Sequence, residues 1–465
     1  MKIRKSTAAA AFIIAAAAVS CSEKQSEPIS NDSSKIEHQV ETENDAKNEQ
    51  TEIREITLAV ADKYDGIQGY ITEFNDSSDK YHVNVKNYLT NDNEYSLESI
   101  DSAINDLEKD IIRGDIPDVL YTSTYEIQKL SSKGSFADIY ELMENDGSIT
   151  KEYFLPSVLR SLETDGHLYS LAPTFMISTI AAKTKFVSQE NWSFNEFQNV
   201  FNSVSDKMEP FEMGNNKQAV LHFLTDGSDD FVNNFNHTCS FDSPEFIQIL
   251  EFANNFPDVD EYAFEQRSCR NDTALMSQLY IESFRDFNVK KQCIFGDDMT
   301  FAGYPSESGR GSKIIIGKQF AIMEASAEKD GAWEFLKSVV DADKVSPQMF
   351  GIPVTEKGFE IVCEAALEKP YFFDDLEDGK KTFFDETGYD SCTNLPITIE
   401  PMSEADKQAY SDFVRGIDRM SSGVESVVDK IVKEETELYF SGEYSAEKCA
   451  EMIQNRVSIL LSEQS

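Results

Sequence analysis

The chain has 465 residues, and 84 acidic side chains against 42 basic ones give it a formal net charge of −42. This charge disfavours nucleic acid as a partner, because a polyanion recruits basic proteins. A hydrophobic content of 40% and an aromatic content of 11% are typical of a well-packed globular protein, and the length predicts two domains.

The first 20 residues have the pattern of a signal peptide. A short basic stretch precedes an alanine-rich apolar run, Ala8–Val19, which is too short to span a bilayer as a permanent helix. The run ends in Ala18-Val19-Ser20-Cys21, which resembles a bacterial lipobox, in which the cysteine is lipidated and becomes the new N-terminus. We therefore expect lipidation of Cys21, with ordinary secretion and cleavage nearby as the alternative.

Residues 21–52 are expected to form the lipidated end and a disordered tether. The segment after Cys21 is polar and has no aromatic residue, so it cannot bury enough apolar surface to offset the entropy of ordering. A flexible chain of about 31 residues has a root-mean-square reach of about 30 Å. The sequence thus predicts a folded body on the outer side of the cell membrane, held there by a lipid anchor.

The folded body opens with alternating strands and helices. Strands are predicted at Ile56–Ala61, His82–Tyr88 and Pro117–Thr122, and helices at residues 67–74 and at Leu97–Arg113. The first strand is apolar on both faces, as a central parallel strand should be, and Gly114 stands where the second helix is capped. The βαβαβ order predicts a parallel sheet with right-handed crossovers, whose ligands bind beyond the carboxyl ends of the strands.

The later part of the chain has mainly helical patterns. Residues 192–256 are expected to be mostly helical, and residues 298–303 and 313–317 have the pattern of strands. Four further helices are predicted at residues 329–340, 406–420, 424–440 and 445–461. Ser445 is a plausible N-cap of the last one.

Five segments follow one another along the chain: Gly114–Val119, Lys133–Ile139, Asp165–Pro173, the return through Gly303–Pro305, Phe320–Ile322 and Ala332–Leu336, and Tyr439–Glu443. In this order they resemble the extracellular solute-binding proteins of ABC importers, in particular their maltose-binding-like carbohydrate cluster. Each piece is short, and their order over nearly the whole mature chain carries the resemblance.

The resemblance implies an α/β, two-lobe periplasmic-binding-protein-like fold of type II. Each lobe is expected to be a mostly parallel sheet flanked by helices, with a helical C-terminal part. Residues 53–171 plus 304–346 would form the first lobe, and residues 172–303 plus 347–465 the second. Crossings are expected at Leu171–Thr174 and near Gly303–Pro305, and the lobes should close over a ligand like a hinge.

Sugar recognition places aromatic rings against the apolar face of a pyranose and polar side chains against its hydroxyls. The resulting candidate ligand-binding residues are Tyr64, Asp65, Thr122, Ser123, Tyr125, Phe175, Tyr280 and Tyr304. Structural alternatives remain: an exposed turn for Tyr64 and Asp65, a helix cap for Ser123, and packing for Phe175 and Tyr304. Tyr280 stands near the position where the family has a ligand-stacking tryptophan, so this sequence departs from the family in having a tyrosine there.

No motif of an enzyme is found. The sequence has no Gly-x-Ser-x-Gly elbow, no His-Glu-x-x-His and no phosphate-binding loop. Beyond Cys21 there are six cysteines, none of them in a CxxC, and the five histidines are scattered, so neither a zinc site nor a cofactor is expected. Disulfides and free buried thiols both remain open for these cysteines.

The sequence therefore predicts the substrate-binding protein of an ABC importer, binding a sugar or oligosaccharide without chemical change. Its expected partners are that small molecule, the permease subunits of the importer and, through the lipid anchor, the membrane. Alternatives are a surface glycan-binding or sensory protein without a transport role, and a binding protein for a solute other than a sugar.

Overall fold

The computed structural model describes residues 53–61, 66–89, 97–233, 236–260, 267–306, 311–375, 380–421 and 425–463. The predicted signal peptide, Cys21 and the tether lie outside the described residues. Residues 51–465 form one compact unit, distinct from residues 1–50. Within the described ranges, no helix combines the length and the apolar character needed to cross a membrane.

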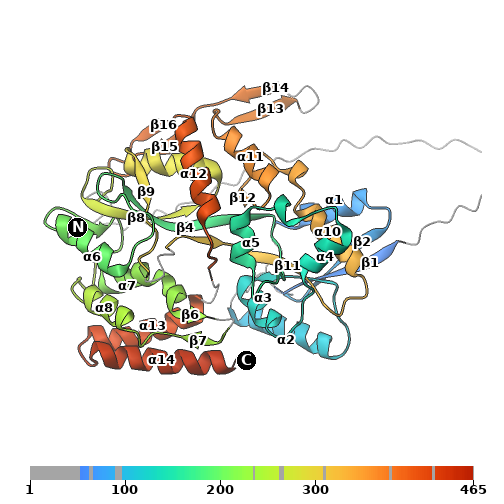
Figure 1. The fold of residues 1–465 in the computed structure, drawn as a ribbon, viewed down its shortest axis with the longest axis horizontal. Coiled ribbons are helices and arrows are strands. Elements are labelled where there is room, and N and C mark those ends of the chain that lie inside the picture. Colours follow the sequence, from blue (N-terminus) through green and yellow to red (C-terminus); the bar gives the residue numbers. More distant parts are fainter. Residues whose placement is uncertain are drawn as a thin grey trace, which may run out of the picture. The chain divides into compact units, whose positions relative to one another are not determined.

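The first sheet has four strands in the order β11-β3-β1-β2. Strands β1 (Arg54–Val60), β2 (Tyr81–Asn87) and β3 (Val119–Ser123) run parallel, as the βαβαβ pattern predicted, and β11 (Lys318–Ile322) runs antiparallel to β3. Figure 1 shows β1 and β2 on the right-hand side of the unit and β11 nearer its centre.

Helices cover both faces of the first sheet. The covering helices are α1 (Gln68–Ser77), α2 (Leu97–Ile112), α3 (Thr124–Ser131) and α10 (Lys329–Val339). Side chains of β1 alternate between two cores: Leu58 packs in one core with Phe74 and Phe335, and Ala59 packs in another with Leu107. Burial on both faces explains why this strand is apolar throughout.

The second sheet is built around the long strand β4 (Thr174–Lys183). Its other strands are β5 (Glu209–Phe211), β8 (Ala274–Ile281), β9 (Met299–Phe301), β10 (Lys313–Ile315) and β12 (Ile352–Pro353). All pairings are antiparallel except that of β5 with β8. The expected mostly parallel second lobe is therefore wrong, because every strand that pairs with β4 runs in the opposite direction to it.

The second sheet is also covered on both faces. The helices are α6 (Phe194–Val204), α7 (Lys217–Thr225), α8 (Pro244–Ala253), α13 (Glu425–Phe440) and α14 (Ala446–Glu463) in one core, and α9 (Phe284–Lys290), α11 (Glu356–Ala365) and α12 (Glu404–Gly416) in the other. The helical middle and the helical C-terminal part are thus confirmed. Ser445 caps α14 by accepting a hydrogen bond from the backbone N–H of Lys448 at 3.2 Å.

The described chain passes between the sheets at Leu171–Thr174, at Ile316–Gly317 and at residues 345–351. The return expected near Gly303–Pro305 is wrong, because Ile314 of β10 pairs with Ile177 of β4. Residues 313–315, assigned from the sequence to the first lobe, therefore belong to the second sheet. The other lobe boundaries stay predictions.

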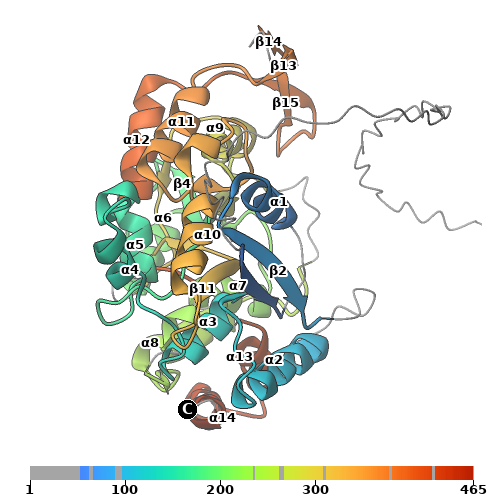
Figure 2. The same ribbon diagram turned by 90° about the vertical axis from the view of Figure 1, so that its right-hand side faces the viewer.

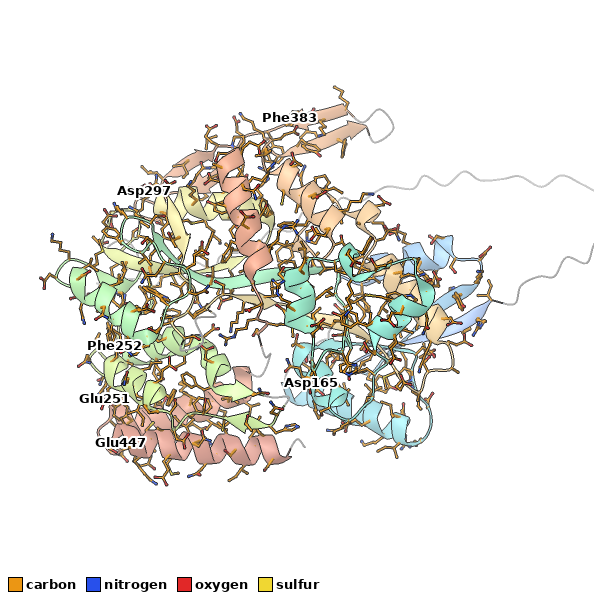
Figure 3. The ribbon with its side chains drawn as sticks, in the orientation of Figure 1. Asp165, Glu251, Phe252, Asp297, Phe383 and Glu447 are labelled. Atoms are coloured by element: carbon orange, nitrogen blue, oxygen red, sulfur yellow. The ribbon has the colours of Figure 1, made fainter. Side chains whose placement is uncertain are left out.

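The remaining elements extend these layers. They are α4 (Ile139–Asp146), α5 (Pro156–Leu162) and three short hairpins, β6 (Val232–Asn233) with β7 (Thr238–Cys239), β13 (Tyr371–Asp375) with β14 (Lys380–Phe383), and β15 (Glu386–Tyr389) with β16 (Pro396–Ile399). Figure 2 shows β13 and β14 at the opposite end of the unit from α14. Figure 3 shows Phe383 on that hairpin, where it is 50% exposed.

Several residues that carried the family resemblance have structural roles. The Asp118 carboxylate accepts hydrogen bonds from the backbone N–H of Thr57 at 2.8 Å and from Ser326 Oγ at 2.6 Å. Asp138 caps α4, and its Oδ2 lies 2.7 Å from Nδ1 of His167. That hydrogen bond raises the pKa of His167. These contacts fix the turns that lead into and out of the first sheet.

The described cysteines carry free thiols, which resolves the alternative left open by the sequence. Four of the six are buried. Burial raises the pKa of Cys363 and of Cys449 to about 12. These thiols therefore remain protonated at neutral pH and pack as small apolar side chains.

Candidate functional site

Two adjoining pockets lie between the first and second sheets, at the chain crossings. We call them the aromatic pocket, of about 580 Å³, and the polar pocket, of about 350 Å³. They share Met176 on β4 and the segment Ile315–Gly317, which contains the second crossing. Because both sheets contribute residues, the two pockets form one interlobe cleft.

Buried rings line the base of the aromatic pocket. Tyr121 on β3 and Phe320 on β11 are cross-strand partners, with ring centroids 4.6 Å apart and ring planes inclined at 39°. Phe175 on β4, only 1% exposed, adds a ring from the second sheet. These side chains belong to the packed core, so they give the pocket a fixed apolar base.

Two further aromatic residues line this pocket and keep exposed surface. Tyr70 on α1 is half-buried, and Phe350 on the third crossing is 68% exposed. The backbone beside Phe350 is held close to β4, because a Cβ at Gly351 would lie 2.4 Å from Thr174 Oγ1. Gly351 has a φ of +85°, which favours glycine, and its N–H donates to the carbonyl of Glu282 at 2.7 Å.

The polar pocket contains a row of side chains across three strands. Lys313 on β10 faces Ser178 on β4, and Ser178 faces Tyr280 on β8. Opposite residues of neighbouring strands project from the same face of a sheet. All three line the polar pocket, and Tyr280 is 47% exposed there.

Tyr304 supports this row from behind. It is fully buried, and its hydroxyl lies 2.6 Å from Ser178 Oγ and accepts a hydrogen bond from Gln278 Nε2 at 2.7 Å. Burial raises the pKa of Tyr304 well above its usual value, so the phenol stays neutral and keeps its proton. Ser178 and Gln278 are both pocket residues, and Tyr304 therefore fixes their positions without lining the pocket.

A buried ion pair closes the polar pocket on the side of α7. Lys313 Nζ lies 2.5 Å from Asp226 Oδ2, and the two side chains are 2% and 5% exposed. Both residues line the pocket together with His222 from α7. A pair as deeply buried as this has lost its hydration, so each charge depends on the other.

A buried hydrogen-bond chain connects the first and second crossings. Thr124 Oγ1 donates to the carbonyl of Ile316 at 2.6 Å and accepts from Gln319 Nε2 at 2.8 Å. The side-chain oxygen of Gln319 accepts in turn from Ser170 Oγ, next to the first crossing. Leu171 and Phe320 are joined by two backbone hydrogen bonds of 3.0 and 2.8 Å. These bonds hold the crossings that border the cleft in register.

The residues predicted from the sequence fall in different places. Ser123 and Tyr280 line the polar pocket, and Phe175 lines the aromatic pocket. Ser123 is also the N-cap of α3, which is the structural alternative anticipated for it. Thr122 is 1% exposed in β3 and borders neither pocket, and Tyr304 lies behind the polar one.

Three of the predicted residues have no described side chain. Tyr64 and Asp65 lie outside the described residues, and only the backbone of Tyr125 is described, within α3. The roles of the predicted site residues stay predictions.

Sequence reasoning missed several residues of the cleft. Tyr70 has the spacing of a core residue on its helix, and Phe350 lies between elements, so neither pattern marks a ligand contact. Lys313 and Asp226 are 87 positions apart, and only the pairing of β10 with β4 brings the lysine to α7. The sequence offered one signal for these residues, the charged Lys313 at the start of the otherwise apolar strand pattern of residues 313–317.

No group of three or more potential metal ligands among His, Cys, Asp and Glu occurs within the described part of the chain. The cleft holds Lys313, Asp226 and His222 but no second carboxylate among its described lining residues. Its described side chains offer aromatic rings, hydroxyls, one amide, the Lys313–Asp226 ion pair and the Lys318 ammonium.

No protein-family model and no curated protein sequence matches the chain. Solved structures do match. The sugar-binding protein MalE from Xanthomonas citri is 14% identical, with a TM-score of 0.52 over 88% of this chain and 98% of that one. A periplasmic oligogalacturonide binding protein from Yersinia enterocolitica is 10% identical, with a TM-score of 0.54 over 88% of this chain and 99% of that one.

A third match is an extracellular solute-binding protein, family 1, from Alicyclobacillus acidocaldarius, 10% identical with a TM-score of 0.52 over 88% of this chain and 98% of that one. The chain therefore has the two-lobe α/β fold of the type II periplasmic binding proteins, which confirms the expected fold class except for the strand direction in the second sheet. The resemblance to the maltose-binding-like proteins found in the sequence holds at the level of the fold.

Proposed function

We propose that the chain is the extracellular substrate-binding protein of an ABC importer and that it captures a sugar or oligosaccharide in the interlobe cleft. The observation that carries this proposal is the joining of an aromatic pocket to a polar pocket between the two sheets. Each volume falls in the range of about 300–1,000 Å³ that is usual for small-molecule sites.

The two pockets fit the two sides of a sugar. Exposed parts of Tyr70 and Phe350 offer apolar ring surface to the C–H face of a pyranose. The hydroxyls of Ser123 and Ser178 and the amide of Gln278 offer hydrogen bonds to its hydroxyl groups. A saccharide of more than one unit would extend past Met176 and Ile315–Gly317, which border both pockets, and place units in each of them.

Capture would couple to closure of the lobes. Residues from both sheets line each pocket, so a ligand gains its full set of contacts only when the lobes are closed, and it favours that form. A permease that recognises the closed form would then distinguish the loaded protein from the empty one. Small-angle scattering should show a smaller radius of gyration with ligand than without, and an unchanged radius in the presence of bound ligand would contradict closure.

The ligand itself is tested with the Cys21→Ser chain, produced without the lipid, in a thermal-shift and calorimetric screen. Neutral mono- and oligosaccharides such as maltotriose should raise the melting temperature, with a Kd near micromolar, about −8 kcal/mol. A protein that ignores a broad panel of neutral sugars but binds a peptide or an inorganic anion tightly would refute the carbohydrate ligand.

Anchoring rests on the lipobox-like Ala18-Val19-Ser20-Cys21 and the polar segment after it. A lipid on Cys21 would keep the importer component at the cell surface, and the segment up to residue 52 would let the body move above it. Cys21→Ser should release the protein from the membrane fraction into the medium. Retention of this variant in the membrane fraction would contradict lipid anchoring.

A further inference from the structure

The charged groups of the polar pocket include a matched pair. Of the described residues that line this pocket, Lys313 and Asp226 carry opposite charges, and the other titratable ones are His222 and Tyr280; Lys318 lines the adjoining aromatic pocket. Lys313 Nζ reaches Asp226 Oδ2 at 2.5 Å and the Asp226 carbonyl at 3.4 Å. A lysine that lines a sugar pocket could attract an acidic sugar, but here its charge is already matched inside the protein.

The backbone holds Asp226 in this position. It follows the last residue of α7 in the left-handed region, with φ 49° and ψ 51°, and its N–H bonds to the carbonyl of His222. Aspartate tolerates this conformation better than most residues. The C-terminal end of a helix also carries partial negative charge, so the Lys313 ammonium is neutralised by the helix end as well as by the carboxylate.

We propose that the polar pocket is an electroneutral subsite, that it accepts an uncharged sugar unit and discriminates against a uronate, and that Asp226 determines this selectivity by neutralising Lys313. The inference rests on the proposed sugar-binding function. A uronate carboxylate entering the pocket would lose hydration without gaining an unmatched cation, and it would approach the Asp226 carboxylate. A neutral unit needs only the hydrogen bonds of residues such as Ser178, Gln278 and Ser421.

The test compares a neutral and an acidic probe on Asp226→Asn, which keeps the shape of the side chain and removes its charge. Maltotriose with trigalacturonate, and galactose with galacturonate, are titrated by calorimetry at pH 8 into the full chain carrying Cys21→Ser. With Lys313 and Asp226 both intact, the protein should bind the neutral sugar of each probe pair at least tenfold more tightly than the acidic one. Asp226→Asn should shift the neutral-to-acidic affinity ratio at least tenfold towards the acidic member, because the Lys313 ammonium then lacks its carboxylate partner.

Two variants serve as controls. Asp226→Asn combined with Lys313→Met removes both charges, and the preference for the neutral probe should return. This double variant is expected to fold even if Asp226→Asn does not, because replacing both partners of a buried pair is much less costly than removing one. Glu368→Gln breaks the exposed Lys381–Glu368 pair of 3.4 Å beside the β13–β14 hairpin and should leave the affinity ratio unchanged.

The outcomes separate this inference from the proposed function. The electroneutral subsite would be overturned, with sugar binding left in place, if the protein with Lys313 and Asp226 intact bound both probes equally or preferred the acidic one. An unchanged neutral-to-acidic affinity ratio in a folded Asp226→Asn variant would overturn it too. A double variant that prefers the acidic probe would overturn it as well. Absence of binding by every sugar would overturn the proposed function and this inference with it.

Discussion

The aromatic and polar pockets share one wall but differ in how their side chains are held. In the aromatic pocket, Tyr70 and Phe350 keep exposed ring surface and come from a helix and from a chain crossing. In the polar pocket, Ser178 and Gln278 are hydrogen-bonded to a buried tyrosine, and Lys313 is fixed by an ion pair. The first arrangement provides adjustable apolar area, and the second provides polar groups in fixed positions.

This difference suggests a division of roles in ligand binding. Apolar ring area supplies affinity with little dependence on the identity of the sugar, since every pyranose has an apolar face. Fixed hydrogen-bonding groups supply selectivity, because a ligand that cannot match them leaves buried polar atoms without partners. Changes in the aromatic pocket should therefore weaken all ligands, and changes in the polar pocket should alter the ranking among them.

The largest effect is expected from Phe350→Ala combined with Tyr70→Ala. Removing both exposed rings should cost about 2 kcal/mol or more in binding, which is at least about thirtyfold in Kd, and the loss should be similar for maltotriose and for other sugars that bind. Calorimetry measures it, with Phe372→Ala as the matched control, because that ring is 54% exposed on the hairpin and lines neither pocket. A loss confined to one sugar would contradict the role of general apolar contact.

A smaller effect is expected from Tyr280→Ala. This ring lines the polar pocket and is 47% exposed, so its removal should weaken binding by about 1 kcal/mol, roughly fivefold, and by different factors for sugars that differ in one hydroxyl. Competition titrations against a panel of epimers measure these factors. Tyr389→Ala, on an exposed ring of β15, should leave all of them unchanged, and an equal factor for every epimer would place Tyr280 with the aromatic pocket instead.

The smallest effect on affinity is expected from Tyr304→Phe. The ring remains, but the hydroxyl that holds Ser178 and Gln278 is lost, at a cost of about 1–2 kcal/mol in the free energy of unfolding and a few-fold in Kd. Urea unfolding and calorimetry measure the two quantities. Tyr410→Phe, at a buried tyrosine of α12, should leave affinity unchanged, and an unchanged Kd in Tyr304→Phe would mean that the polar pocket does not depend on its support.

Elements of the first sheet were predicted well from the sequence, and the central strands of the second sheet were not. The strand at Ile56–Ala61 is a continuous apolar run and the helix at Leu97–Arg113 has a clear helical period, and the structure has β1 and α2 within two residues of the predicted ends. Strand β4 was not assigned, because Thr174–Lys183 is buried between two cores and mixes small, polar and apolar residues without a clear alternation. A strand buried on both faces can be recognised when it is apolar throughout, as β1 is, and β4 lacks that signal because Thr174, Ser178 and Thr179 interrupt its apolar residues.

The cleft shows the same limit. Ser123 was predicted because it follows the third strand, Phe175 because it follows the first crossing, and Tyr280 because it stands near the family's ligand-stacking tryptophan. All three line a pocket. Tyr304 was predicted as a ligand contact at a crossing, but the crossing lies at Ile316–Gly317 and the tyrosine is buried behind the pocket. Its position followed from assigning residues 304–346 to the first lobe, which the pairing of β10 with β4 corrects.

The sequence by itself determined the acidic composition of the chain, the βαβαβ start of its first sheet and its helical C-terminal part, and its resemblance to the solute-binding proteins implied the two-lobe fold. The first three depend on composition and on patterns within about 20 residues, where side-chain period and capping decide local structure. Only the tertiary structure decided which residues meet in the cleft, because the pairing of Lys313 with Ser178 joins strands 135 positions apart. Such pairing depends on the packing of whole layers, which no local pattern encodes.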